Sequence, residues 1–146
     1  MATSFPSFPS TSTGSSAGDA SIKQLPRVSI VLPTYNESGN IEALIHQLLS
    51  LRSRFSLEIL VVDDDSADGT ADLVRQISHR WPQVRLVRRV GRSGLSSAIK
   101  EGLLDATGDL ALVMDSDGQH DPSAVSKALE SLQANELDLV VGSRFH

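Results

Sequence analysis

The sequence predicts an α/β domain of the Rossmann-like layered type, with a mostly parallel sheet and alternating helices. The first observation is that short apolar runs typical of strands alternate with segments whose apolar residues are spaced three and four positions apart, as on one face of a helix. The second is that the runs at 57–63, 110–114 and 137–142 are dominated by apolar residues, as in parallel strands that are buried on both faces. This alternation favours right-handed crossovers and one layered domain.

The strands and helices are expected in a regular order. A β-branched run at 28–34 begins the sheet, and a helix follows in which apolar residues recur with helical spacing from Ile41 to Leu49. In the third expected helix, Ala98 and Gly102 place small residues on one face, which predicts close packing against the sheet. The other expected strands are 57–63, 84–89, 110–114 and 137–142, and the other expected helices run from about 68 to 80, 95 to 106 and 122 to about 134.

The composition is that of an ordinary globular protein, and it excludes several classes. Of 146 residues, 40% are hydrophobic and 21% are charged, and none is cysteine, so disulfide frameworks, thiolate zinc sites and cysteine nucleophiles are excluded. The net charge of -5 argues against a nucleic-acid partner, because phosphates need clustered Lys and Arg. Residues 1–26 are rich in Ser, Thr, Gly and Pro and are expected to be a disordered tail, which leaves 27–146 as the folded domain. No apolar run reaches the ~18 residues of a membrane span.

Acidic residues collect after three of the expected strands. Glu37 follows the first strand, residues 63–65 are an Asp triplet after the second, and Asp115 and Asp117 follow the fourth. Because the carboxyl ends of parallel strands share one edge, where such folds bind ligands, these side chains are expected to lie close together. Two carboxylates ~5 Å apart repel by roughly 3 kcal/mol at an effective dielectric constant of about 20. The sequence therefore predicts a cation at this edge, unless some of the acids only cap helices.

Asp115 and Asp117 are the strongest candidates for cation ligands. They alternate on a turn after an apolar strand, with Gly118 beside them, and Gln119 adds an amide oxygen at the same spacing. Carboxylate and amide oxygens suit a hard divalent cation such as Mg²⁺ or Mn²⁺. An Asp-x-Asp pair is by itself a weak motif.

Other polar residues have structural interpretations. Asp68, together with Ser66, is expected to cap the second helix, and Asp121 to cap the fourth, with Pro122 as its first helical residue. A basic stretch is expected to be a solvated strand edge and loop, although one of its members, Arg92, could instead approach a phosphate group. The arginines of this basic stretch are Arg80, Arg85, Arg88, Arg89 and Arg92.

Five sequence motifs follow one another in a fixed order. They are Pro33-Thr34-Tyr35-Asn36-Glu37; Val61-Val62-Asp63-Asp64-Asp65-Ser66-Ala67-Asp68-Gly69-Thr70; Gly94-Leu95-Ser96-Ser97-Ala98; Gly108-Asp109 with Val113-Met114-Asp115-Ser116-Asp117-Gly118-Gln119-His120; and Gly142-Ser143-Arg144. Each is modest alone, but the set in this order is specific. Over about residues 27–146, the chain resembles glycosyltransferase family 2, and most of all its dolichol-phosphate mannosyltransferase-like branch of polyprenyl-phosphate glycosyltransferases.

The resemblance implies a GT-A-type fold and a role for each matching residue. Asp117 and Arg144 would be catalytic, and Mg²⁺ or Mn²⁺ would be held by Asp115, Asp117 and Gln119. The ribose and base would be held by the first two motifs and the diphosphate by the last two. The residues implied in binding the nucleotide sugar are Pro33, Tyr35, Glu37, Val62, Asp64, Asp115, Ser116, Asp117 and Arg144.

The resemblance also implies a reaction. The chain would belong to an inverting, metal-dependent enzyme that transfers mannose or glucose from GDP-mannose or UDP-glucose to a dolichyl or undecaprenyl phosphate. Such a phosphate is already anionic, so it needs no general base. The family's catalytic domain continues past its Gly-Ser-Arg motif, here 142–144, with a segment that shapes the acceptor site. We therefore expect a donor-binding half, from a protein that acts at the cytoplasmic face of a membrane through a C-terminal segment absent from this chain.

Two other interpretations stay open from the residues themselves. Residues 58–65 resemble the acidic pocket of a phosphoacceptor receiver domain, in which Asp115 would be phosphorylated and Ser143 would lie behind it. Such a domain needs a lysine after its fifth strand, and the sequence has none after Lys127. The other interpretation is a nucleotide-binding fragment without activity of its own.

Overall fold

The computed structural model of the chain describes residues 25–119 and 122–142. Strands and helices alternate through these ranges, as the sequence predicted. The elements in order are β1 (Arg27–Thr34), α1 (Ile41–Leu49), the 3₁₀ turn η1 (Ser50–Ser53), β2 (Ser56–Asp63), α2 (Thr70–Arg80), β3 (Val84–Arg88), α3 (Leu95–Asp105), β4 (Leu110–Val113) and α4 (Pro122–Ala134).

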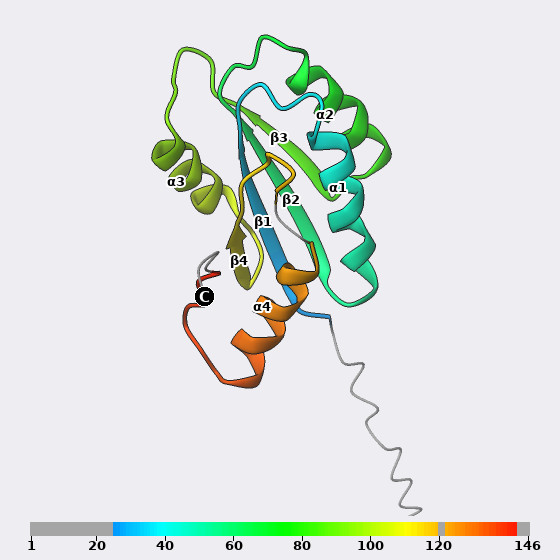
Figure 1. The fold of residues 1–146 in the computed structure, drawn as a ribbon, viewed down its shortest axis with the longest axis vertical. Coiled ribbons are helices and arrows are strands. Elements are labelled where there is room, and N and C mark those ends of the chain that lie inside the picture. Colours follow the sequence, from blue (N-terminus) through cyan, green and yellow to red (C-terminus); the bar gives the residue numbers. More distant parts are fainter. Residues whose placement is uncertain (1–24, 120–121, 143–146) are drawn as a thin grey trace, which may run out of the picture.

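A parallel four-stranded sheet in the order β3-β2-β1-β4 forms the centre of the fold (Figure 1). The helices α1 and α2 pack on one face of the sheet, and α3 packs on the other. Val125 and Leu129 of α4 join the same hydrophobic cluster as α1 and α2. The layered α/β architecture with a parallel sheet is therefore confirmed.

The two central strands are buried because helices cover both of their faces. Every residue of β1 after Arg27 is buried. Val28 and Ile30 point into the cluster under α1 and α2, whereas Val31 and Leu60 of β2 belong to the cluster under α3. Successive side chains of a strand point to opposite faces, so one apolar run supplies both layers.

The helices differ little from their expected ranges. The apolar stripe of α1 is buried from Ile41 to Leu49, and α2 begins at Thr70, directly after Gly69, whose φ is 90°. Asp121, the expected cap of α4, lies outside the described residues. Within the described ranges, no helix has the length and apolar character needed to cross a bilayer.

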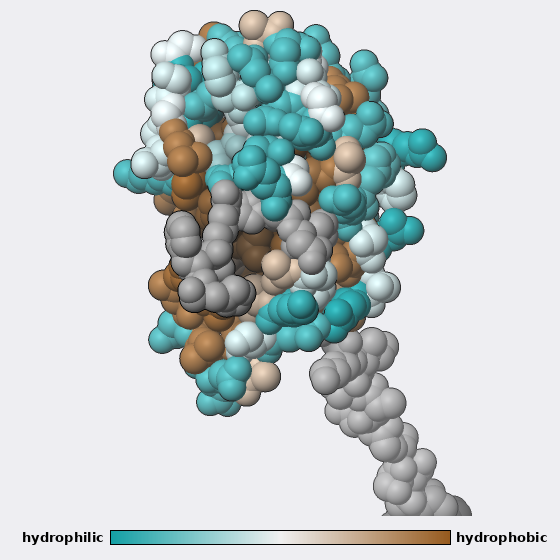
Figure 2. All heavy atoms as spheres, viewed as in Figure 1, coloured by the Kyte–Doolittle hydropathy of each residue, from teal (hydrophilic) through white to brown (hydrophobic). Residues whose placement is uncertain are grey.

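The prediction of a fifth strand at 137–142 was wrong. After α4 the chain turns at 135–136, where Glu136 has a φ of 50°, and then continues without regular secondary structure. Leu139 and Val141 are 75% and 77% exposed, and Figure 2 shows hydrophobic surface on this side of the molecule. An apolar run becomes a strand only when its backbone groups find a neighbouring strand, and the described residues provide none for this segment.

The prediction that the fourth strand is buried on both faces was also wrong. In the described part of the chain, β4 pairs only with β1 and forms an edge of the sheet. Its residues alternate between half-buried and exposed, and the last one, Val113, is 39% exposed. Its apolar sequence resembles that of a central strand, but α3 packs on β1 and β2, so β4 is covered less than they are.

A hydrogen-bond network around Glu58 holds the amino-terminal end of the sheet. The Glu58 carboxylate accepts hydrogen bonds from Ser29 Oγ (2.6 Å), from Thr107 N (2.9 Å) and from Arg85 Nη1 (2.6 Å). Arg85 also donates to Asp105 Oδ2 (2.6 Å) at the end of α3. Burial alone raises the pKa of Glu58, but the hydrogen bonds from Ser29, Thr107 and Arg85 outweigh it and hold the pKa below its usual value.

The small residues on α3 permit the close packing that the sequence predicted. Gly102 is buried against the sheet, and a Cβ atom built on it would lie far inside van der Waals contact with Val31 and 3.0 Å from Cγ2 of Val62. Val31 and Val62 are both fully buried, so neither side chain has room to move aside.

Replacing Gly102 with alanine should therefore destabilise the fold. Overpacking a filled core costs about 1–3 kcal/mol, and the higher helix propensity of alanine returns only about 1 kcal/mol. We expect a lower free energy of unfolding in urea denaturation, with partial recovery in the Gly102→Ala, Val31→Ala double variant. Gly39→Ala is the control, because a Cβ atom there meets nothing within 4 Å. Equal stability of the Gly102→Ala and Gly39→Ala chains would contradict this packing.

Glu58 should make the stability depend on pH. Its folded-state pKa lies below the unfolded-state value of about 4.3, so its ionised form stabilises the fold above that pH. This contribution is lost as the pH falls through the folded-state pKa. The Glu58→Gln chain should be less stable than wild type near neutral pH, and the difference should shrink as the pH falls through the folded-state pKa of Glu58.

Urea denaturation at a series of pH values measures this difference. Glu42→Gln serves as the control, because Glu42 is an exposed glutamate of α1 and should leave the pH profile unchanged. A stability difference between Glu58→Gln and wild type that stays constant across the acid range would show that Glu58 does not contribute in this way.

Candidate functional site

The candidate site lies at the carboxyl ends of the strands. Thr34 of β1 is level with Asp63 of β2, and Asp63 is level with Arg88 of β3, so the loops after these strands begin at the same edge. The loop after β4 reaches this edge too, because Ser116 Oγ donates a 3.0 Å hydrogen bond to the carbonyl of Pro33. Hydrophilic residues dominate this end of the molecule, at the top of Figures 1 and 2.

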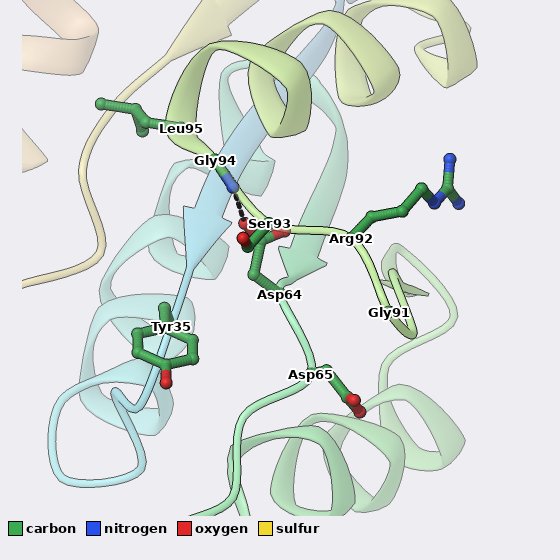
Figure 3. A pocket seen from close by; sticks show the side chains of 8 residues that line it. All are labelled: Tyr35, Asp64, Asp65, Gly91, Arg92, Ser93, Gly94 and Leu95. Atoms are coloured by element: carbon green, nitrogen blue, oxygen red, sulfur yellow. Dashed lines mark hydrogen bonds between the residues drawn. The ribbon is translucent and has the colours of Figure 1, made fainter.

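A pocket of about 630 Å³ opens at this edge between three of the loops (Figure 3). Tyr35 enters it from the loop after β1, Asp64 and Asp65 from the end of β2, and residues 91–95 from the segment between β3 and α3. Tyr35 is 62% exposed, and its ring offers a flat apolar surface to a pocket that the Asp64 and Asp65 carboxylates also line. Such a combination suits a planar heterocycle that carries N–H donors.

Asp64 fixes the segment that forms one wall of the pocket. Its Oδ2 accepts a 2.7 Å hydrogen bond from the backbone N–H of Gly94, drawn in Figure 3, and its Oδ1 accepts a 2.6 Å hydrogen bond from Arg89 Nη1. Gly94 has a φ of 125°, a conformation that favours glycine. The Asp64 side chain is only 9% exposed, so these bonds are partly shielded from water.

The prediction of a solvated basic stretch was wrong for Arg89. Its side chain is 2% exposed and forms ion pairs with Asp64, which directly follows β2, and with Glu101 on α3. The other four arginines of the stretch are half-buried or exposed, and Arg88 donates to Asp65 Oδ1. Two carboxylates of the acidic edge are therefore balanced by arginines of the protein itself.

The first aspartate of the triplet has a structural role. Asp63 is fully buried, and its carboxylate accepts hydrogen bonds from the backbone N–H and the hydroxyl of Ser66 (3.1 and 2.5 Å). Ser66 therefore does not cap α2; it closes the turn that follows β2. Hydrogen bonds to the charged form are what make a buried carboxylate tolerable.

The loop after β1 is tied to the loop after β2 through its backbone. Three consecutive N–H groups of the first loop each donate to a side-chain oxygen of the second, so the position of Tyr35 depends on the 66–70 segment. The pairs are Asn36 N with Ser66 Oγ (2.8 Å), Glu37 N with Thr70 Oγ1 (3.0 Å) and Ser38 N with Asp68 Oδ2 (2.9 Å).

Asp68 holds this connection together at the start of α2. The N-cap of α2 is Gly69, without a side-chain cap bond, so the prediction that Asp68 is the cap was wrong. Asp68 Oδ1 instead accepts hydrogen bonds from the backbone N–H and the hydroxyl of Thr70, the first residue of the helix (3.1 and 2.5 Å). The hydrogen bonds from Thr70 and from the backbone of Ser38 hold the pKa of Asp68 far below its usual value. The same hydrogen bonds connect the loop after β1 to the start of α2 through one carboxylate.

The predicted metal ligands follow β4, on the other side of β1 from the pocket. Ser116 is buried with its hydroxyl on Pro33, Asp115 before it is exposed, and Asp117 after it is half-buried. Asp117 Oδ1 accepts a 2.9 Å hydrogen bond from the backbone N–H of Gln119, which shapes the turn. Contact between Ser116 and a diphosphate would therefore involve its backbone rather than its hydroxyl.

Metal ligation by the described side chains alone is limited. Within residues 25–119 and 122–142, no three histidine, cysteine or acidic side chains come together in a way that could hold a metal ion. Asp115, Asp117 and Gln119 offer two carboxylates and one amide oxygen, which are hard ligands of the type that Mg²⁺ and Mn²⁺ prefer. These residues fit a cation that takes further oxygen atoms from a bound ligand.

The remaining predicted site residues divide into three groups. Tyr35 and Asp64 line the pocket, and Glu37 lies in the same loop as Tyr35. Val62 is fully buried under α3, so its side chain does not line the pocket. Arg144 lies outside the described residues.

The sequence did not indicate the burial of Arg89. It stands among other arginines at the end of a strand, which is the usual pattern of an exposed edge. Only its spatial neighbours, Asp64 and Glu101, reveal that it lies inside the protein.

Comparison with known proteins gives one family. Residues 29–146 match the family described as Glycosyl transferase family 2. The chain is 40% identical over 119 residues to a dolichol-phosphate mannosyltransferase of Pyrococcus furiosus, a match that covers 82% of this chain and 33% of the relative.

Two solved structures extend the comparison. A mannosyltransferase from Pyrobaculum calidifontis in complex with GDP-mannose and Mn²⁺ has a TM-score of 0.63 and 30% identity, over 75% of this chain and 33% of that one. A glucosyl-3-phosphoglycerate synthase from Mycobacterium tuberculosis, in complex with Mn²⁺, UDP and phosphoglyceric acid, has a TM-score of 0.58 and 28% identity, over 73% and 39% of the two chains. The GT-A-type fold is confirmed by these likenesses.

Replacing Thr70 with valine should loosen the loop after β1. The change keeps the shape of the buried side chain but leaves the Glu37 N–H without its acceptor, which costs about 1–3 kcal/mol. We expect lower thermal stability and faster hydrogen exchange at the Glu37 amide. Thr34→Val is the matched control, because the buried Thr34 hydroxyl only donates to the Leu32 carbonyl. Unchanged hydrogen exchange at the Glu37 amide in the Thr70→Val chain would contradict the role of the Thr70 hydroxyl in holding the loop after β1.

Proposed function

The chain belongs to glycosyl transferase family 2, and from this membership and the geometry of the site we propose that it binds a nucleotide-diphosphate sugar. The chain spans about a third to less than half of the length of the curated relatives that it matches. The transfer reaction is therefore proposed for a protein that includes this part. Family membership also removes the interpretation as a phosphoacceptor receiver domain.

The observation that carries this proposal is the placement of the pocket and the Asp115–Gln119 turn on one edge of the sheet. The pocket follows β2 and the turn follows β4, and β1 lies between them. Neighbouring strands are about 4.8 Å apart, so the two strand ends are separated by about 10 Å, on the scale of a nucleoside. We assign the nucleobase and ribose to the pocket, near Tyr35, Asp64 and Glu37, and the diphosphate to the turn.

A divalent cation, Mg²⁺ or Mn²⁺, is proposed between the turn and the diphosphate. Asp115, Asp117 and Gln119 would hold it together with phosphate oxygens, which is the usual way that Mg²⁺ is bound beside a nucleotide. When bound, the cation supplies positive charge that stabilises the departing diphosphate. Support comes from the structural relatives, which were solved with Mn²⁺ and a nucleotide or nucleotide sugar.

Residues of the chain would prepare the donor for transfer. Asp117 is assigned a catalytic role because it is half-buried beside the proposed diphosphate position, and its bond to the Gln119 backbone limits its movement. Arg144 is assigned the second catalytic role, in which its fixed positive charge would face the donor phosphates. Pro33 and Val62 would contribute through backbone atoms, because their side chains are buried.

The proposed reaction is an inverting transfer of mannose or glucose to a polyisoprenyl phosphate such as a dolichyl or undecaprenyl phosphate. An oxygen of the acceptor phosphate would form the new bond to the anomeric carbon as the bond to the nucleoside diphosphate breaks. A phosphate oxygen is already anionic, so no residue of this chain is assigned as a general base. The names of the curated relatives support this acceptor class.

The reaction is proposed at the cytoplasmic face of a membrane. The acceptor is a lipid and the nucleotide sugar is water-soluble, so the two meet at a membrane surface. Contact with the membrane is assigned to a C-terminal segment outside this chain, and no nucleic-acid partner is proposed.

Donor binding can be tested by thermal denaturation of the chain with GDP-mannose or UDP-glucose, with and without Mn²⁺. At a hundredfold excess over Kd, a ligand adds about 2.7 kcal/mol of stability, which raises Tm by several degrees. We expect a shift with one nucleotide sugar that grows when Mn²⁺ is present. Absence of any shift with either nucleotide sugar would contradict the proposal.

Asp117→Asn should abolish the part of the shift that depends on Mn²⁺. Asp109→Asn is the matched control, because Asp109 is an exposed aspartate at the amino end of β4, at the opposite edge of the sheet. Equal Mn²⁺ dependence in both variants would remove Asp117 from the metal site.

A transfer assay with a polyisoprenyl phosphate in detergent distinguishes enzyme from binding fragment. Binding without transfer by this chain would support the second candidate, a nucleotide-binding fragment without activity of its own. That candidate is favoured by the short span of the chain relative to its relatives.

A further inference from the structure

We propose that Arg89 is a positioning residue, which sets the Asp64 carboxylate and the 91–94 segment in the geometry that receives the nucleobase end of the donor. The proposal rests on the nucleotide-sugar function proposed above. It concerns a side chain that lies behind the wall of the pocket and does not line it.

The side chain of Arg89 connects three parts of the fold. It is among the largest fully buried side chains of the described residues, with 2% of its surface exposed. Its Nη1 donates to Asp64 Oδ1 (2.6 Å) on the end of β2, and its Nη2 donates to Ser97 Oγ (2.5 Å) on α3. Its Nε lies 3.2 Å from Glu101 Oε2, also on α3. The planar, fixed shape of guanidinium allows one side chain to hold these groups at the same time.

Gly94 is held at both of its backbone polar groups by this arrangement. Its N–H donates to Asp64 Oδ2 (2.7 Å), and its carbonyl accepts from Arg89 Nη1 (3.3 Å). Because Asp64 and Arg89 also bind each other, the three groups form a closed ring of contacts. Gly94 is the N-cap residue of α3 and lines the pocket, so the ring determines where this wall stands relative to Tyr35 on the other side.

The charges of this cluster balance before any ligand arrives. Asp64 and Glu101 carry two negative charges, and Arg89 and Arg92 carry two positive charges, with Arg92 Nη1 3.1 Å from Glu101 Oε2. A carboxylate oxygen with one hydrogen bond can still accept another, so Asp64 can take an N–H group of a base. Without Arg89, the Asp64 carboxylate, which is 9% exposed, would lose its charged partner and one of the two hydrogen bonds that orient it.

Arg85, in the strand that Arg89 follows, is an arginine with a purely structural role. It also contacts two carboxylates, Glu58 and Asp105, but at the amino-terminal end of the sheet and with 41% of its side chain exposed. Loss of either arginine removes two ion pairs. Only loss of Arg89 should change the pocket, which makes Arg85 a matched control.

The test compares Arg89→Met, Arg89→Lys and Arg85→Met with the wild-type chain. We measure Kd for GDP and UDP by calorimetry in the presence of Mn²⁺, and hydrogen exchange at the Gly94 amide in the free chain. Arg89→Met should raise Kd by about tenfold and speed exchange at Gly94, because the site is no longer preorganised. Arg89→Lys keeps the positive charge but loses the planar guanidinium with its several N–H donors, so it should raise Kd less than Arg89→Met does. If Arg89→Met does not fold, the Arg89→Lys chain tests the positioning role. Arg85→Met should lower Tm but leave Kd and Gly94 exchange unchanged.

Each outcome decides for or against the positioning role. An unchanged Kd in the Arg89 variants, or an equal rise in Arg85→Met, would overturn it. If the wild-type chain binds neither nucleotide, the proposed function fails. Hydrogen exchange at the Gly94 amide is then the measurement that tests the positioning role. Faster exchange in the Arg89 variants than in Arg85→Met supports that role, and equal exchange in all of these variants overturns it.

Discussion

Parallel pairing of β1 with both β2 and β4 determines where the site residues can lie. In that arrangement the chain leaves all three strands at the same edge, so loops that are far apart in the sequence begin side by side. The pairing is held by backbone hydrogen bonds inside a buried layer, where an unpaired N–H or C=O group is costly. The bond from Ser116 to the carbonyl of Pro33 extends the same alignment beyond the end of β4. The pocket and the Asp115–Gln119 turn both depend on this alignment.

The acidic edge consists of two parts with different chemistry. Near β2, Asp63 is satisfied by Ser66, and Asp64 and Asp65 are balanced by arginines from the end of β3. In this part Asp64 and Asp65 each have an arginine beside them, and it is the part that we assign to the base and ribose of the proposed nucleotide. Near β4, Asp117 has only a backbone N–H from the turn as its described hydrogen-bond donor. The proposed cation is therefore assigned to this turn, where Asp115, Asp117 and Gln119 offer oxygen ligands.

The site is assembled from loops, yet hydrogen bonds between those loops hold them in place. The backbone of the loop after β1 donates to side chains of the loop after β2, and Asp64 binds the backbone of the segment before α3. Loops that carry binding residues usually have few apolar contacts, so hydrogen bonds between loops are what keep them ordered. Loops that are ordered before the ligand arrives lose less conformational freedom on binding.

The order of strands and helices, the layered parallel sheet and the gathering of acids at one edge could be predicted from local patterns of residues. Each follows from a local pattern: the period of apolar residues, and the rule that parallel strands end on the same side. The tertiary structure decided that 137–142 is not a strand, that β4 is an edge strand in the described part of the chain, and that Arg89 is buried. An apolar run in a sequence shows only that the segment can be buried. A charged residue shows only that its side chain needs water or an opposite charge beside it. Which partner it meets depends on contacts between Asp64, Arg89 and Glu101, and the folded chain alone brings these residues together.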